Sequence, residues 1–361
     1  MADDTAAVTR TPIAASLSGY LDAVHAGDRR AAVAVAMNLL ELGVPPERII
    51  TELLAQSQRE IGLGWQEGRW SVALEHRASA ITEAVLQTLT DTALRAPGAI
   101  QEGSRGRVVV ACTEGEWHVL PGRMASEVLR LRGADVSFIG PSVPAEELAG
   151  FLGEDPPAVV AVTCSMPLSL LGATRTIGAL RALGMHVLCG GRGFGDGGEW
   201  AAAVGADTWA PTFSSGADLL LTLLAETRPP PRPPVGSPAV VAEVALLRRD
   251  QTAWVEAAVS LALARWPQLA TTDRGVQATR EDLASTLSAI GSATLTTDPD
   301  LVGQYATWFE AVMRAHDLPV WFVASAFELL LAVVPAEVPL LRQMAQVGLR
   351  ACTSAPPAGD G

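Results

Sequence analysis

RVVVACTEGEWHVLPGRM, residues 107–124, decides the fold class of this chain. Its first residues form an apolar, valine-rich run that predicts a buried strand, and after a polar turn the apolar residues recur at helical spacing. Fully apolar strands that alternate with helices indicate a parallel sheet covered on both faces. We therefore predict a doubly wound, Rossmann-like α/β domain over residues 104–227, with its ligand at the carboxyl ends of the strands. The later predicted strands are DVSFIG, AVVAVTC, MHVLCGG and ADTWA.

Residues 12–97 carry a helical pattern instead. Four segments place apolar residues three and four positions apart, and glycine or proline separates them. Asp28 and Ser71 stand at the starts of two segments, where such side chains cap free backbone N–H groups. Four amphipathic helices with short connections predict an antiparallel four-helix bundle.

A proline-rich stretch, RPPPRPPVGSP at residues 228–238, predicts a semi-extended linker. Beyond it, residues 239–352 show helical spacing again. The sequence therefore predicts three domains, in the order all-α, α/β and all-α.

Composition narrows the function. The chain has 361 residues and a formal net charge of −13, and all 26 of its basic residues are arginine. This acidic balance disfavours a nucleic-acid surface, which depends on clustered positive charge. Without lysine there is neither a P-loop nor a Schiff base to pyridoxal phosphate or retinal. The N-terminus lacks a signal-peptide pattern, glutamate and proline interrupt the most apolar late segment, and the four cysteines form no CxxC motif. We expect a cytoplasmic protein without nucleic-acid or membrane partners.

Glu116 and His118 follow the first predicted strand directly. In a sheet of this type the loop after a strand faces the ligand. A histidine that binds a metal commonly hands its other ring nitrogen to a carboxylate, which fixes its tautomer and raises its basicity. Taken alone, a loop histidine is most often a surface polar residue. The position at the strand end, with Glu116 two residues earlier, favours a metal ligand.

These residues resemble a known family. ExHxxPG, residues 116–122, is similar to the DxHxxG loop of cobalamin-binding domains, with glutamate replacing aspartate and the glycine displaced by one position. Thr163-Cys164-Ser165 stands where the family has SxL, without its leucine, and Gly190-Gly191 ends the fourth strand. The resemblance implies that His118 replaces the dimethylbenzimidazole ligand of cobalt. It also implies that the nucleotide tail lies between the strands, beside Thr163, Ser165, Gly190 and Gly191.

The helical bundle resembles the cap that covers the upper face of the corrin in such proteins. Trp65-x9-Glu75-His76 is similar to a signature of the light-sensing cobalamin regulators. The resemblance implies that Trp65 packs against the adenosyl group of adenosylcobalamin and that His76 binds cobalt once light has removed that group. Without it, Trp65 would be a core aromatic and Glu75-His76 a solvated helix face. Trp70 is expected in the core.

The chain also departs from those regulators. They begin with a helix-turn-helix domain, whereas this chain begins almost directly with the bundle, so DNA binding is not expected. DPDLVGQYATWFEAVMRAHDLPVWFVASAFELLL, in the third domain, resembles globin-like segments, and the whole arrangement resembles the photocobilins, which pair adenosylcobalamin with a bilin such as biliverdin. Because Cys352 lies at the very end of the domain, any bilin is expected to be held noncovalently. Haem bound at His316 and a plain dimerisation domain are the alternatives. The candidate residues for a second chromophore are Trp254, Tyr305, Trp308, Arg314 and His316.

The predicted function is a photoreceptor and not an enzyme, in which light cleaves the cobalt–carbon bond and the cap rearranges. We expect a homodimer that signals to an effector protein. A corrinoid methyl carrier serving a separate methyltransferase is the alternative. Such a carrier would share the first two domains but needs neither the Trp65, Glu75 and His76 set nor a third domain. The cobalamin subunit of a radical mutase would need a large substrate-binding barrel, for which this chain has no room.

Overall fold

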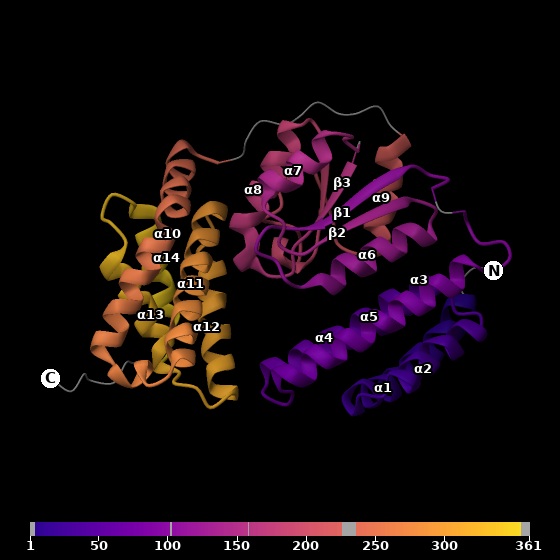
Figure 1. The fold of residues 1–361 in the computed structure, drawn as a ribbon, viewed down its shortest axis with the longest axis horizontal. Coiled ribbons are helices and arrows are strands. Elements are labelled where there is room, and N and C mark those ends of the chain that lie inside the picture. Colours follow the sequence, from indigo (N-terminus) through magenta and orange to yellow (C-terminus); the bar gives the residue numbers. More distant parts are fainter. Residues whose placement is uncertain (1–3, 102, 158, 226–235, 355–361) are drawn as a thin grey trace.

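The computed structural model describes residues 4–101, 103–157, 159–225 and 236–354, and within residues 4–11 only the backbone. Three groups of elements lie side by side (Figure 1). Long N-terminal helices run beneath a sheet domain, and the C-terminal helices stand against one edge of that domain.

The N-terminal helices form the cap. Asp28 accepts a hydrogen bond from the backbone N–H of Ala31, and Ser71 accepts one from Leu74, so both predicted helix starts are confirmed. The elements of the cap are α1 (Asp4–Ala26), α2 (Arg29–Glu41), α3 (Pro46–Arg48), η1 (Ile49–Leu54), α4 (Ala55–Gln66) and α5 (Val72–Leu94).

One turn of the cap has a form that the sequence did not predict. η1 is a π-helix inserted between α3 and α4. Ile49, Ile50, Leu53 and Leu54 of this segment are all fully buried.

The sheet is parallel throughout, with strand order β2-β1-β3-β4-β5. The order reverses between β1 and β3, so the loops after these two strands flank the topological switch point where ligands bind in this architecture. The predicted five-stranded parallel sheet is confirmed. Its strands are β1 (Arg107–Cys112), β2 (Asp135–Gly140), β3 (Val159–Thr163), β4 (His186–Gly190) and β5 (Thr208–Ala210).

Alternate residues of β1 belong to different cores. Val108 and Val110 pack with the cap and with α6 and α9, whereas Val109 and Ala111 pack with α7, α8 and the C-terminal helices. This alternation follows from the two-residue period of a strand. The helix α9 was not predicted. The helices that cover the sheet are α6 (Val119–Leu131), α7 (Ala145–Gly153), α8 (Leu170–Ala182) and α9 (Phe213–Ala225).

The third domain is helical, as predicted, and it begins earlier than the apolar pattern indicated. Ser237 accepts a hydrogen bond from the N–H of Val240, and Pro238 occupies the first turn, so α10 starts at residue 238. Most of the predicted linker lies outside the described residues. The elements are α10 (Pro238–Arg265), η4 (Pro267–Ala270), α11 (Asp273–Thr296), α12 (Pro299–Ala315), α13 (Trp321–Val333) and α14 (Pro339–Ala351).

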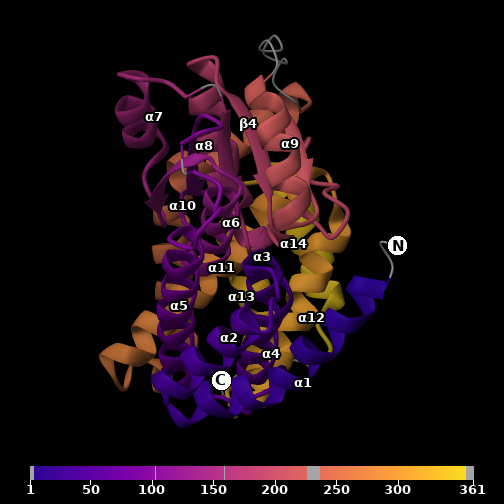
Figure 2. The same cartoon turned by 90° about the vertical axis from the view of Figure 1, so that its right-hand side faces the viewer.

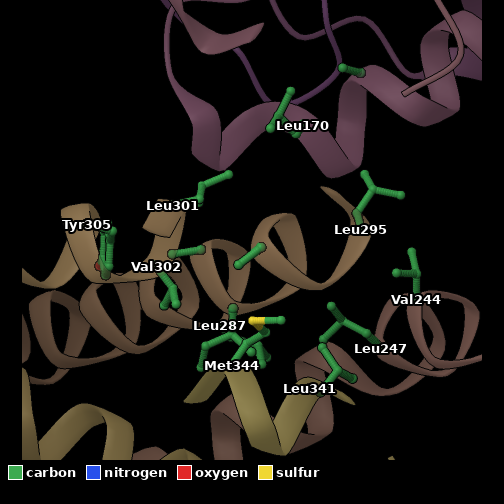
Figure 3. Close-up of a cluster of buried hydrophobic side chains, with 14 of the residues drawn as sticks. Leu170, Val244, Leu247, Leu287, Leu295, Leu301, Val302, Tyr305, Leu341 and Met344 are labelled. Carbon is green, nitrogen blue, oxygen red and sulfur yellow. The ribbon is translucent and has the colours of Figure 1, made fainter. Parts of the chain in front are cut away.

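These helices share a hydrophobic core with the sheet domain. Leu170, at the start of α8, points toward Leu301 of α12 (Figure 3). A Cβ atom at Gly291 of α11 would lie 2.4 Å from Leu247 of α10 and 2.8 Å from Leu171 of α8, so any larger residue would displace these two leucine side chains. The contact lies beside the short helix η2 (Pro167–Ser169), which follows β3, and therefore near the carboxyl ends of the strands.

Among the described residues, no helix is both long and apolar enough to cross a bilayer.

Asp282 in α11 makes stability depend on pH. Burial, followed by the charge of Glu281, raises the pKa of Asp282 to about 7. The unfolded chain releases this proton near its ordinary pKa, roughly 4, so stability falls as pH rises from about 4 to about 7. Asp282→Asn should raise the melting temperature at pH 8, by a stabilisation on the order of 1–3 kcal/mol. Its effect should be much smaller near pH 4.5. Glu281→Gln removes only the second and smaller cause of the shift and should give a smaller gain; an equal gain there would contradict the explanation.

Candidate functional site

Glu116 holds His118 in one orientation. The side chain of Glu116 is buried, and its Oε1 lies 2.5 Å from Nδ1 of His118 and accepts the backbone N–H of His118 at 2.9 Å. Because a carboxylate only accepts, Nδ1 carries the hydrogen. The Nε2 atom of the neutral ring then has a free lone pair, the form in which a histidine binds a metal.

The other oxygen of Glu116 ties two loops together. Its Oε2 accepts the backbone N–H groups of Ser165 and Met166, at 2.7 and 3.2 Å. These residues follow β3, whereas Glu116 follows β1, so one carboxylate spans the switch point of the sheet. This second role could not be predicted from the sequence, because the partners are backbone amides.

The hydrogen bonds set the charge of this pair. Burial alone would raise the pKa of Glu116, but the hydrogen bonds from His118 and Ser165 outweigh it and hold that pKa below its usual range. The hydrogen bond to Glu116 raises the pKa of His118, and the negative charge of Glu75 in the cap adds to the effect. The first turn of α5 therefore lies close enough to influence His118 across the domain boundary.

The cap repeats the carboxylate–histidine arrangement. Oε2 of Glu75 lies 2.5 Å from Nδ1 of His76, and Oε1 of Glu75 accepts the hydroxyl of Ser79 at 2.8 Å. The His76 side chain is 75% exposed, so its Nε2 edge is open to a ligand. Trp65, from the last turn of α4, is half-buried. Trp70 is buried against His25, which confirms its expected core position.

The residues expected around the nucleotide tail fall into two groups. Thr163 is buried at the end of β3, and a Cβ atom at Gly122 would lie 3.2 Å from its hydroxyl oxygen. The backbone of Ser165 is already engaged by Glu116. Gly191 has φ +108°, and a Cβ atom there would lie 2.2 Å from the carbonyl oxygen of Cys164. The close contact between the segments that follow β3 and β4 therefore requires glycine at position 191. At Gly190, in contrast, a Cβ atom would meet only the carbonyl oxygen of Ala210, at 3.8 Å.

The candidates of the third domain do not form one group. Trp254 and Tyr305 are core residues, and the Tyr305 hydroxyl is bonded to that of Thr286 at 3.1 Å. Trp308 is half-buried, and Arg314 is exposed. His316 is turned away from these residues, because it follows the last turn of α12 and its Nε2 lies 2.9 Å from the Trp65 carbonyl oxygen in the cap.

Two further residues of the β1 loop were missed by the sequence interpretation. Trp117 is 73% exposed although it lies between Glu116 and His118. Glu114 accepts the N–H of Ala145 at the start of α7 and pairs with Arg175 at 2.9 Å, which fixes the other side of the loop. Both residues lie in the loop after β1, and this position at the carboxyl end of a strand was the sequence feature that could have identified them.

Comparison with known proteins agrees with this geometry. Residues 17–90 match a family model described as a B12 binding domain, and residues 106–213 match a second model with the same description. The first two domains are B12-binding domains. No curated protein matches the chain.

Three solved structures resemble parts of the chain. The monomethylamine corrinoid protein of Methanosarcina barkeri is 18% identical, with a TM-score of 0.49, over 56% of this chain and 96% of that one. A chain of the methanol:cobalamin methyltransferase complex from the same organism is 18% identical, with a TM-score of 0.31, over 59% and 81%. A cobalamin-binding protein of Desulfitobacterium hafniense DCB-2 is 20% identical, with a TM-score of 0.32, over 57% and 98%.

The described residues fit a cobalamin. His118 offers a ring nitrogen at the switch point, Trp117 offers an exposed flat surface next to it in the chain, and Glu75 of the cap lies near enough for its charge to raise the pKa of His118. Cobalt prefers imidazole nitrogen among protein ligands of this kind. His118 is thus the residue that would hold the metal from the side of the sheet domain.

Loss of either partner in the Glu116–His118 pair should weaken cobalamin binding. His118→Ala removes the ligand, and Glu116→Gln removes the carboxylate that fixes its tautomer, which typically costs about ten- to hundredfold in affinity. Absorbance titration with hydroxocobalamin measures both effects. Glu310→Gln is the matched control, because Glu310 is also buried and accepts backbone N–H groups, but in the third domain. Unchanged affinity and spectrum in His118→Ala would refute the assignment.

Proposed function

We propose that this protein is a light sensor that uses adenosylcobalamin, with His118 below the cobalt and the cap above it. One observation carries the proposal. Two carboxylate–histidine pairs, Glu116–His118 and Glu75–His76, come from different domains and both leave Nε2 free. The influence of Glu75 on His118 supports their placement on two sides of one site.

Each residue then has a defined task. Adenosylcobalamin, when bound, supplies a light-sensitive cobalt–carbon bond. His118 would hold the metal from the sheet domain, and Glu116 keeps the Nδ1 hydrogen of that histidine in place. Trp65 would shield the adenosyl group from water. His76 would supply a second imidazole after loss of that group, and Glu75 orients His76 through its Nδ1 atom.

A corrinoid methyl carrier is equally consistent with two B12-binding domains. Such a carrier has to expose the upper face of its cofactor to a separate enzyme. Here the last turn of α4, which carries Trp65, is held by the third domain through the hydrogen bond between His316 and the Trp65 carbonyl. This contact favours chemistry that is completed within the chain.

We also propose that the third domain binds a bilin noncovalently, and that the protein acts as a cytoplasmic homodimer that signals to an effector protein. Support for the bilin comes from the aromatic cluster of Tyr305, Trp308 and Phe309, in which the rings of Trp308 and Phe309 stack at 6.5 Å. Haem is less well supported, because Nε2 of His316, the sole histidine of this domain, is engaged with the cap. A domain used only for dimerisation is the alternative.

Light should change the spectrum of the protein loaded with adenosylcobalamin, and His76 should determine the product. Illuminated wild type should show a spectrum with two imidazole ligands on cobalt, whereas illuminated His76→Ala should lack it and release corrinoid more readily. His25→Ala, which removes another exposed histidine of the cap, should behave as wild type. Identical illuminated spectra for wild type and His76→Ala would remove His76 from the mechanism. A wild-type spectrum that light leaves unchanged would favour the methyl carrier.

Biliverdin should bind the full chain and give a shifted red band that remains with the protein on gel filtration. The full chain is the correct sample, because the third domain shares its core with the sheet domain. Trp308→Ala should weaken the band, since it removes half-buried aromatic surface, and His316→Ala should leave it nearly unchanged. Haem is titrated in parallel. If neither pigment co-elutes and the chain runs as a dimer, the third domain is an assembly module.

A further inference from the structure

The end of α12 touches the cap beside Trp65. Nε2 of His316 donates a hydrogen bond to the Trp65 carbonyl oxygen at 2.9 Å, and the two rings pack with their centroids 5.6 Å apart. Both views place this end of α12 next to α4 (Figure 1 and Figure 2). Trp65 is the cap residue proposed to face the adenosyl group. A contact from the third domain therefore reaches the last turn of α4, the part of the cap proposed to cover the cobalamin site.

A second close approach lies three residues further along the chain, in the turn that follows α4. Gly68 has φ +71°, and a Cβ atom there would lie 2.3 Å from the carbonyl oxygen of Ala315. No side chain fits at this position while the contact is closed. The backbone of the cap and the end of α12 thus meet directly, without an intervening side chain.

His316 is held in place by the end of its own helix. Its N–H is bonded to the Val312 carbonyl, and the N–H of Leu318 reaches back to the Met313 carbonyl at 2.8 Å. Asp317, between them, adopts φ +55°, the left-handed conformation that commonly ends a helix. The position of the imidazole is therefore set by α12 and not by a mobile loop.

The other end of α12 is fixed to the sheet domain. Asp298 caps the helix, with Oδ1 accepting the N–H of Asp300, and its Oδ2 accepts the indole N–H of Trp200 at 2.9 Å. Trp200 lies in the loop region that follows Gly190-Gly191 at the end of β4. With 17 residues, α12 spans about 25 Å at 1.5 Å per residue. One rigid helix thus connects the strand-end side of the site to the cap side.

We propose that α12 is a strut that sets the spacing between cap and sheet domain at the cobalamin site, and that His316 is the positioning residue for Trp65. This inference rests on the proposed role of Trp65. A movement of the cap either breaks the His316–Trp65 contact or carries α12 with it. By linkage, a fixed α12 then strengthens binding of a ligand at the adenosyl side by the same free energy by which that ligand stabilises the position of α12.

The test compares two cobalamins in the dark. Adenosylcobalamin contacts Trp65 through its upper ligand, whereas hydroxocobalamin is too small there to depend on it. His316→Ala should weaken adenosylcobalamin binding about three- to tenfold, the loss expected for one hydrogen bond, and leave hydroxocobalamin affinity unchanged. His316→Gln keeps a donor and should restore part of the preference, whereas His316→Phe keeps only ring packing and should not. Equal discrimination in wild type and His316→Ala overturns the proposal.

Gly68→Ala tests the same contact independently. Its added methyl group would push the cap away from Ala315 without changing the ring of Trp65 or His316. It should loosen adenosylcobalamin binding in the same way as His316→Ala. Gly43→Ala is the matched control, because Gly43 has φ +81° and a Cβ there would meet nothing within 4 Å. The control carries the same backbone strain without the contact. Equal effects of Gly68→Ala and Gly43→Ala would overturn the proposal.

Hydrogen exchange of the cofactor-free chain separates this inference from the proposed function. Residues 64–70 and 312–318 should exchange faster in His316→Ala and in Gly68→Ala, but not in Gly43→Ala. If the wild-type protein does not bind adenosylcobalamin more tightly than hydroxocobalamin, but these segments exchange faster in the two variants, the role of α12 as a strut is supported and the proposed role of Trp65 is wrong. If the segments do not respond, the strut itself is overturned, whatever the cofactor does.

Discussion

A single buried carboxylate organises the cobalamin site. Glu116 is 1% exposed, and such a group is tolerated only where its oxygens are hydrogen-bonded. One oxygen orients His118 and the other binds the two amides that follow β3. The direction of the metal-binding nitrogen and the shape of the β3 loop are therefore fixed by the same group. Neither can move without leaving part of a buried carboxylate unpaired, which is why the end of the sheet is preorganised.

The parts of this arrangement that the sequence predicted depend on local signals. Strands β1 to β5 follow from apolar runs, and the helix starts at Asp28 and Ser71 follow from side chains that cap their own helices. The parts that escaped prediction depend on partners remote in sequence. The amides of Ser165 and Met166 carry no side-chain signal, and Trp65 and His316 are 251 positions apart, so no local pattern indicates their contact. His316 was singled out as a possible haem ligand, but in the fold its Nε2 atom forms a hydrogen bond with the Trp65 carbonyl of the cap.

The third domain illustrates the same limit. Helical periodicity identified α12, which buries one face, whereas α11 and α13 also bury runs of consecutive residues, 289–295 and 322–327. Periodicity does not say which neighbour covers that face. Helix α8 is one such neighbour. Glycine at position 291 leaves room on α11 for Leu171 of α8, and the third domain and the sheet domain share one hydrophobic core. A proline-rich linker suggested a tethered domain, whereas the shared core attaches it to the edge of the sheet that binds the cofactor.

The two histidine pairs differ in a way that suits two different roles. In the sheet domain the Glu116 side chain is 2% exposed, and its histidine is oriented by a network that also binds two amides. In the cap the Glu75 side chain is 29% exposed and His76 is 75% exposed. An exposed pair of this kind contributes at most about 1 kcal/mol, because water competes for both partners. Reorienting His76 therefore costs little, while reorienting His118 requires a buried carboxylate to lose its partner. A permanent ligand needs the second property, and a ligand recruited only after the cap rearranges needs the first.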